Sequence, residues 1–242
     1  MTYLKVNIKG GVYEIQLNRP HKHHALTIVM LSELCETLKH AFENESIKII
    51  TLKSSGKVFC AGADLTEMHE QTEGLVSSLI MLIKVLQQKN KPIFVSLAGN
   101  IYGGGSILLG FADVIFALDS VKVVMPEIKS DLWPVLLLPI LKRHLPSATL
   151  AHMAMNAEPL YAKNAYALGW FSALFNDINQ LEDKLEDTLK QYCCHSKLTL
   201  NACFECYRDT FSVAMKDEDL DKLGMKLIQL VRVKETNLLE GN

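Results

Sequence analysis

The chain has 242 residues, of which 49% are hydrophobic and 21% are charged, and its formal net charge is -2. This length and composition allow one large globular domain or two small ones around a sizeable core. A nearly neutral chain has no basic footprint for nucleic acid or an acidic membrane surface, so we expect neither partner. Residues 1–18 lack the long apolar run of a secretory signal. We therefore expect a cytoplasmic protein whose six cysteines are reduced.

One uncharged stretch, residues 92–112, has a length that just suits a membrane-spanning helix. It contains a run of three glycines, Pro92 and Asn100, and it has no sustained apolar helix pattern. We interpret it as two buried elements joined by a glycine-rich turn.

The first elements alternate between strand and helix. VYEIQLN, residues 12–18, places apolar and polar residues on opposite faces with a period of two, which predicts a strand. From Thr27 onward, apolar residues recur at helical spacing, with Thr27 as the expected N-cap. The same reasoning predicts a strand over 47–55, a helix over 75–88 and a buried strand over 92–99.

The second half of the chain changes character. Two short strands are predicted over 113–118 and 122–127, and beyond them the pattern indicates helices only. The first of these helices are expected over 138–144, 148–156 and 162–168. The layout predicts an α/β core of strand-strand-helix units with an all-helical C-terminal region.

The stretch NIYGGGSILLGFAD, residues 100–113, raises a question of function. Leu108 stands where GxGxxG would need its third glycine, and no GK[ST] follows, so neither nucleotide-binding motif is formed. Glycines before a helix start can expose N–H donors to a ligand, which would build half of an oxyanion hole. The alternative is a tight structural turn between a strand and a helix.

A second small-residue turn, FCAGADL at residues 59–65, favours the first reading, because two turns can direct two N–H groups at one oxygen. With this block the chain resembles the crotonase (enoyl-CoA hydratase/isomerase) superfamily. The resemblance covers roughly residues 17–171 and rests on several blocks in family order. These blocks are LNRPHKHHAL, FCAGADL, KPIFVSLAGNIYGGG, LLGFADVIFA, VMPEI and LYAKNAYALGWF.

The resemblance implies a spiral of strand-strand-helix (ββα) units that binds an acyl-CoA thioester. Its carbonyl oxygen would lie between the backbone N–H groups of Ala63 and Gly104. Fixed N–H dipoles suit the enolate that forms when a C2 proton leaves. Further binding residues implied by the motif positions are His24, Ala25, Leu26, Cys60, Ala61, Gly62, Asp64, Leu65, Gly103, Ile107 and Leu132.

The resemblance also implies an architecture and an assembly. Residues 1–195 would form the acyl-CoA-binding core, and residues 196–242 would form a helical trimerisation or lid region. The expected assembly is a homotrimer or a dimer of trimers. No metal is implied, and no cofactor apart from the coenzyme A that belongs to the substrate.

The family's hydratases use two glutamates, one that acts as a base on water and one that acts as an acid. Here Ile107 stands at the first position, and Glu127 stands at the second. Isoleucine can neither orient nor deprotonate water, whereas one glutamate can move a proton from C2 to C4 of a 3-enoyl-CoA. Apolar neighbours such as Ile107 and Leu108 would raise the pKa of Glu127. The sequence therefore predicts a double-bond isomerase that uses Glu127 alone.

Other chemistries stay open at this stage. A weak enoyl-CoA hydratase, an acyl-thioester decarboxylase and a non-catalytic acyl-CoA-binding protein are all compatible with the same blocks. Cys203 and Cys206, with the cysteines and histidine at 193–195, have a spacing that suits zinc, but we expect core cysteines on a helix. The histidines at 21, 23 and 24 are expected to face solvent, and Asp113 is expected to be structural.

Overall fold

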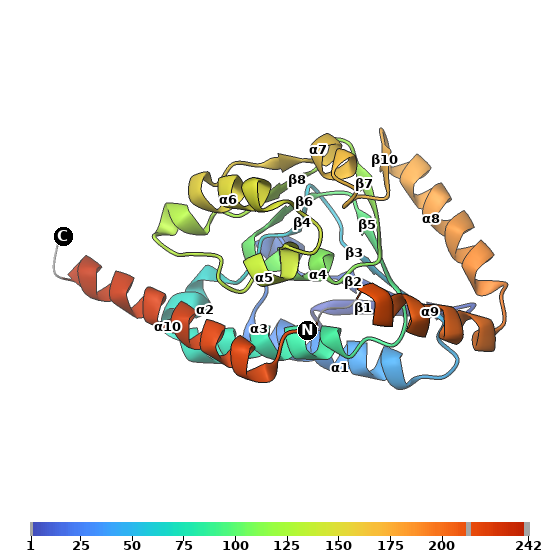
Figure 1. The fold of residues 1–242 in the computed structure, drawn as a ribbon, viewed down its shortest axis with the longest axis horizontal. Coiled ribbons are helices and arrows are strands. Elements are labelled where there is room, and N and C mark those ends of the chain that lie inside the picture. Colours follow the sequence, from blue (N-terminus) through green and yellow to red (C-terminus); the bar gives the residue numbers. More distant parts are fainter. Residues whose placement is uncertain (1, 212–213, 240–242) are drawn as a thin grey trace.

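The computed structural model describes residues 2–211 and 214–239. Strands of two sheets alternate along the chain, and helical segments follow them, so that strand-strand-helix units wind into a spiral (Figure 1). The predicted α/β spiral is confirmed.

The larger sheet has six strands in the order β1-β2-β3-β5-β7-β10. β1 and β2 pair antiparallel, and all later neighbours pair in parallel. Tyr13, Ile15 and Leu17 are buried as the period of two predicts. The bounds are β1 (Leu4–Lys9), β2 (Val12–Leu17), β3 (Ile49–Lys53), β5 (Ile93–Leu97), β7 (Val114–Leu118) and β10 (Ala173–Phe175).

The smaller sheet has four strands in the order β4-β6-β8-β9, of which the first three are parallel. Its strands are very short: β4 (Val58–Cys60), β6 (Asn100–Tyr102), β8 (Lys122–Val124) and β9 (Leu160–Tyr161). Sequence reasoning missed β4 and β6, because three residues do not complete a recognisable period. The prediction of helices alone after residue 127 is wrong, since β9 and β10 each add a strand to a sheet.

The predicted helices are present with small shifts at their ends. Thr27 caps α1 as expected, because its side chain accepts the Met30 N–H at 3.1 Å. The α-helices are α1 (Ile28–Glu43), α2 (Leu65–Glu70), α3 (Thr72–Gln87), α4 (Ser106–Gly110), α5 (Leu138–Leu141), α6 (Ser147–Asn156), α7 (Ala162–Ala167), α8 (Ile178–Cys193), α9 (Lys197–Phe211) and α10 (Asp217–Leu239). The 3-10 helices are η1 (Pro20–Lys22), η2 (Gly103–Gly105) and η3 (Glu127–Ser130).

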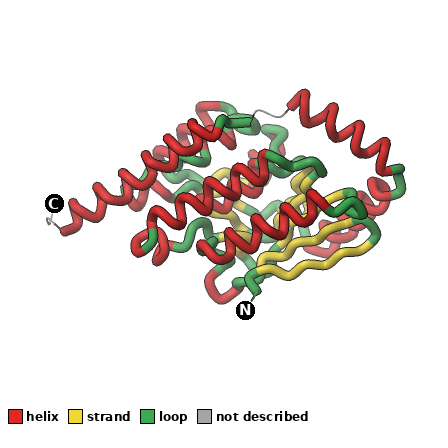
Figure 2. The backbone as a smooth tube through the Cα atoms, turned by 90° about the horizontal axis from the view of Figure 1, so that it is seen from below, coloured by secondary structure: helices red, strands yellow, loops and turns green. Residues whose placement is uncertain are grey.

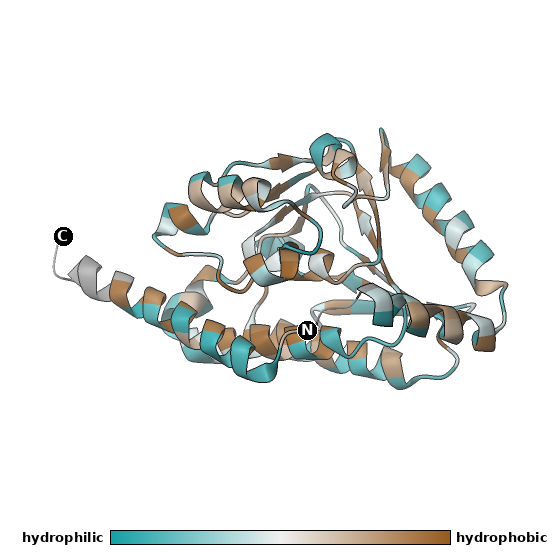
Figure 3. Ribbon diagram, in the orientation of Figure 1, coloured by the Kyte–Doolittle hydropathy of each residue, from teal (hydrophilic) through white to brown (hydrophobic). Residues whose placement is uncertain are grey.

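Helices cover both faces of the larger sheet. α1, α3 and α10 lie side by side, with α3 in the middle (Figure 2). On the opposite face, α8 contacts β5, β7 and β10 through a small separate core that includes Phe94, Phe116 and Leu185. Hydrophobic residues gather on the strands and on the helix sides that face them (Figure 3).

The fold decides the predictions made for Asp113 and for the cysteines of α9. Asp113 is structural, as predicted: it pairs with Lys89 at 2.6 Å and accepts the Ile93 N–H at 2.8 Å. Cys203 and Cys206 are exposed on α9, so the prediction that they belong to the core is wrong. Among the described residues, no three His, Cys, Asp or Glu side chains come together as a metal site would require.

Candidate active site

A cavity of about 260 Å³ lies at the carboxyl ends of three parallel strands of the smaller sheet. Its wall includes the residues that follow β4, β6 and β8, which is where α/β folds place their ligand sites. We call it the acyl cavity. It is lined by Ala61, Gly62, Ala63, Leu65, Met68, Leu79, Gly103, Gly104, Ile107, Pro126, Glu127, Lys129, Ser130, Leu132, Trp133, Pro134, Val135, Leu136, Leu137 and Leu227.

The glycine turn brings backbone close to the carboxyl group of Glu127. Gly103 has φ of +45°, a left-handed value that favours glycine. A Cβ on Gly103 would stand 2.8 Å from Glu127 Oε1. The sequence therefore needs glycine here for two reasons, the backbone conformation and the space that the carboxyl group occupies.

The amides of Ala63 and Gly104 lie close together, as two donors for one oxygen must. Leu26 and Ala63 form a parallel bridge, in which the Leu26 N–H donates to Gly62 O and the Asp64 N–H donates to Leu26 O. This pattern turns the N–H of Ala63 away from Leu26. A Cβ on Gly104 would lie 3.5 Å from the Ala63 nitrogen.

Gly104 is the second residue of η2, so its own N–H has no acceptor inside that helix. Gly62, with φ of +87°, packs directly against this turn, because a Cβ there would lie 2.8 Å from Tyr102 O. The two small-residue turns predicted from the sequence are thus adjacent, as an oxyanion hole would require.

Buried polar groups fix the segment before α1. His24 is only 1% exposed, so the prediction of a solvent-facing histidine is wrong, although His21 and His23 are exposed. Its Nδ1 accepts the Arg19 N–H at 3.1 Å, and Nε2 lies 3.0 Å from Ser55 O. The proton therefore resides on Nε2. Burial lowers the pKa of His24, which keeps the ring neutral.

Two further contacts connect this segment to the oxyanion turns. The Cys60 thiol donates to His24 O at 3.2 Å and accepts the Gly62 N–H at 3.5 Å. Arg19 pairs with Asp64 at 2.7 Å, and Asp64 also caps α2 by accepting the Thr66 N–H. Burial works to raise the pKa of Asp64, but Arg19 and the capping amides outweigh it and hold that pKa below its usual value.

Glu127 is the one acidic side chain on the wall of the acyl cavity among the described residues. Its Oε2 is buried and has no hydrogen-bond partner in the described part of the chain. Burial raises the pKa of Glu127 to about 7. The sequence placed Glu127 in a strand, but β8 ends at Val124, and Glu127 opens η3. A carboxyl group with this pKa exchanges protons readily near neutral pH.

Ile107 is fully buried and lines the same wall from α4. No second carboxylate therefore stands across the cavity from Glu127 in the described structure. Ile107 and its apolar neighbours contribute to the desolvation that raises the pKa of Glu127.

The predicted binding residues fall into two groups. Nine of the residues named from the sequence line the cavity: Ala61, Gly62, Ala63, Leu65, Gly103, Gly104, Ile107, Glu127 and Leu132. His24, Leu26, Cys60 and Asp64 have buried side chains and, with Ala25, lie behind that wall. These five can contact a ligand only through backbone or the edge of the loop that they form.

Sequence reasoning missed the apolar part of the wall. Met68 on α2, Leu79 on α3 and Leu227 on α10 line the cavity, as does the segment 133–137. The uncharged run after Leu132 was a usable signal. Leu227 had none, because the apolar stripe of a packed helix looks the same whether or not it meets a cavity.

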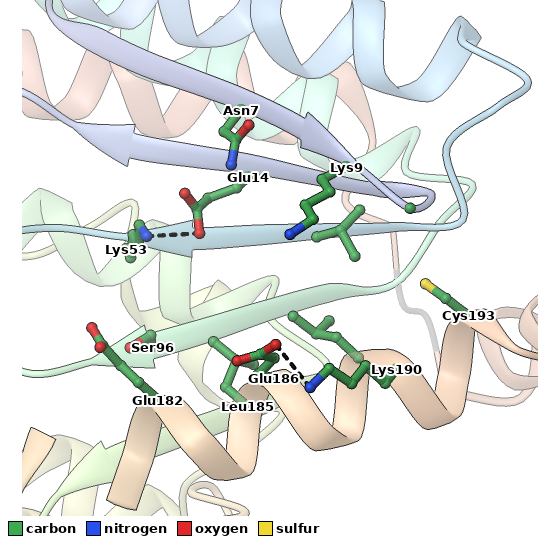
Figure 4. A pocket seen from close by; sticks show the side chains of 13 residues that line it. Asn7, Lys9, Glu14, Lys53, Ser96, Glu182, Leu185, Glu186, Lys190 and Cys193 are labelled. Carbon is green, nitrogen blue, oxygen red and sulfur yellow. Dashed lines mark ion pairs between the residues drawn. The ribbon is translucent and has the colours of Figure 1, made fainter. Parts of the chain in front are cut away.

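A second cavity, of about 470 Å³, lies between α8 and the part of the larger sheet that contains β1, β2 and β3 (Figure 4). We call it the α8 groove. Four of its charged side chains form two ion pairs: Lys53 meets Glu14 at 2.7 Å, and Lys190 meets Glu186 at 2.8 Å. Elsewhere, none of the described helices is both long and apolar enough to cross a membrane.

A family model described as enoyl-CoA hydratase/isomerase matches residues 7–232. The chain belongs to this family, the crotonase superfamily. It is accordingly a crotonase-superfamily enzyme, a hydratase or an isomerase of acyl-CoA thioesters.

Individual relatives agree with the family match. The chain is 29% identical over 89% of its length to 2,3-dehydroadipyl-CoA hydratase of Escherichia coli, of which the match covers 86%. It is 28% identical over 81% of its length to 1,2-epoxyphenylacetyl-CoA isomerase of the same organism, covering 76% of that chain. A crystal structure of an enoyl-CoA hydratase from Mycobacterium avium has the same fold, with a TM-score of 0.82 at 20% identity, covering 100% of this chain and 98% of that one.

Proposed function

We propose that this enzyme shifts the double bond of a 3-enoyl-CoA to give the conjugated 2-enoyl-CoA. The observation that carries the proposal is the single buried carboxyl group of Glu127, which has a pKa of about 7 and lies beside the paired amides of Ala63 and Gly104. The relatives include both a hydratase and an isomerase, so the choice between the two reactions must rest on the site itself.

The reaction balances with one residue and no water. The Glu127 carboxylate removes a proton from C2, and the electron pair moves to the thioester oxygen as an enolate. The N–H groups of Ala63 and Gly104 stabilise that negative charge. Glu127 then returns the proton to C4, and the C2–C3 double bond forms as the carbonyl is restored. Ile107 excludes the second acid that water addition needs.

The binding of coenzyme A is proposed along the segments 24–26 and 60–65, mainly through backbone groups.

A homotrimer or a dimer of trimers is proposed for the assembly. Exposed apolar side chains on α6, on β9, and on α7 and its C-cap support this assembly, since exposed apolar residues are typical of an interface: Met155, Tyr161, Tyr166 and Leu168. Sedimentation velocity at several protein concentrations tests this assembly.

A substrate panel tests the reaction. We expect conversion of 3-hexenoyl-CoA to the conjugated thioester, with little hydration of 2-hexenoyl-CoA and no decarboxylation of malonyl-CoA. Rapid hydration would contradict the proposal, and tight thioester binding without any turnover would indicate a binding protein. Ile107→Glu should introduce hydration that the isosteric control Ile107→Gln does not, because only the carboxylate can act on water.

A further inference from the structure

The C-terminal helix supplies part of the wall of the acyl cavity. α10 lies antiparallel along α3: near one end Lys84 contacts Asp217 and Asp221, at 3.4 and 3.2 Å, and near the other Glu73 pairs with Arg232. Leu227, between these two ends, is 8% exposed and lines the cavity.

A glycine sets how closely α10 approaches. Gly224 is buried, and a Cβ there would stand 2.3 Å from Ile80 Cδ1 and 3.4 Å from Val76 Cγ1. Any larger residue would have to displace the end of the Ile80 side chain or move the two helices apart. Because residues three apart share a helix face, the close contact at Gly224 directs Leu227 toward α3 and the cavity. Leu79, the neighbour of Ile80, reaches the same cavity from α3.

The chemistry of the wall restricts what can fill it. Among the described residues, the wall has two charged side chains, Glu127 and Lys129, and that of Lys129 is exposed. Most of the other residues of the wall are aliphatic or aromatic, Met68 and Leu227 among them. The volume of about 260 Å³ is slightly below the ~300–1,000 Å³ of ordinary ligand pockets, which favours a short chain.

We propose that Leu227 is a specificity-determining residue that limits this enzyme to short, uncharged acyl chains. The inference rests on the acyl-CoA binding of the proposed function, but it does not depend on which reaction Glu127 performs. Gly224 acts as the positioning residue, because it sets the distance between α10 and α3 and thereby the place of Leu227.

Binding of saturated acyl-CoA thioesters tests this without any chemistry. Calorimetric titration should give tightest binding for butyryl- to octanoyl-CoA and weaker binding for decanoyl- and dodecanoyl-CoA. In Leu227→Ala, the optimum should move to longer chains, with affinity gained by about fourfold for each additional methylene that the enlarged cavity accepts.

The matched control is Val231→Ala. Val231 is 1% exposed on the same helix, but it does not line the cavity. This variant should weaken the packing of α10 by a comparable amount, yet leave the order of chain lengths unchanged. If Leu227→Ala and Val231→Ala alter the profile alike, or if neither alters it, the proposal is wrong.

A second pair of probes tests charge. Adipyl-CoA and hexanoyl-CoA have acyl chains of the same length and differ only at the terminal group. We expect adipyl-CoA to bind at least ~30-fold more weakly, since its carboxylate would enter an apolar wall. Equal binding would show that Lys129 or another cation serves the chain end, and it would overturn the uncharged part of the proposal.

The two proposals fail in different ways. If the enzyme shows no isomerase activity, we still expect the same binding profiles and the same shift in Leu227→Ala. An unchanged profile in Leu227→Ala, with isomerisation still dependent on Glu127, would overturn the specificity role and leave the reaction standing.

Discussion

Two of the cavities in the described part of the chain, the α8 groove and the acyl cavity, differ in a way that volume does not predict. The α8 groove, at about 470 Å³, is larger than the acyl cavity, at about 260 Å³. In the groove, Glu14 and Glu186 each have a lysine within 2.8 Å. In the acyl cavity, Glu127 has a buried oxygen without a partner among the described residues. A buried polar group that the fold leaves unpaired marks the site better than the size of the space.

The groove has a simple structural origin. α8 packs on β5, β7 and β10, and the half of that sheet face formed by β1, β2 and β3 extends beyond it. Glu14 is partly exposed and Glu186 is exposed, so water as well as a lysine partner stabilises each carboxylate. The acyl cavity has a different origin, because three strand ends and a packed C-terminal helix converge on it and give it a mostly apolar wall.

The strongest test of this comparison removes one carboxylate from each cavity. Glu127→Gln should reduce isomerase activity by about 10²–10⁴-fold, because the amide cannot carry the proton. Glu186→Gln, the matched change in the α8 groove, should leave activity unchanged. Steady-state rates with 3-hexenoyl-CoA measure both. Equal effects of the two variants would refute the assignment of the site.

A second test compares two glycines, one beside each cavity, and we expect a smaller loss of activity than for Glu127→Gln. Gly103 and Gly10 both have left-handed φ, +45° and +58°. A Cβ on Gly103 meets Glu127 Oε1, whereas a Cβ on Gly10, beside the α8 groove, meets nothing within 4 Å.

Both alanine variants should lose stability by roughly 1–2 kcal/mol from backbone strain. Only Gly103→Ala should also lose activity, by about 10–100-fold, because it displaces the carboxyl group. Urea unfolding and kcat/KM separate the two effects. A fully active Gly103→Ala would show that the position of Glu127 does not limit the reaction.

The pH dependence provides the smallest effect. The raised pKa of Glu127, about 7, means that the carboxyl group is protonated below that pH and cannot act as a base. We expect kcat/KM to fall about tenfold per pH unit below 7 and to level off above it. A profile whose midpoint lies near the ordinary glutamate value would contradict the buried, unpaired state of Glu127.

Much of the fold followed from periodicity, and much of the site followed from two glycine-containing turns. Tyr13, Ile15 and Leu17 alternate, and Thr27 begins a helix, so local pattern was sufficient there. Local pattern failed for β4, β6, β9 and β10, which have only two or three residues each. Such strands exist because a neighbouring strand pairs with them, and that partner is remote in sequence.

The sequence by itself determined the two small-residue turns, the presence of Glu127 and the absence of an acid at position 107. Those features are properties of residue type at fixed spacing. Tertiary structure alone decided that His24 is buried and that Glu127 Oε2 has no partner among the described residues. It also decided that Leu227 lines the same cavity as Glu127, although the two residues are far apart in the sequence. Burial and pairing depend on contacts between distant segments, so no local pattern records them.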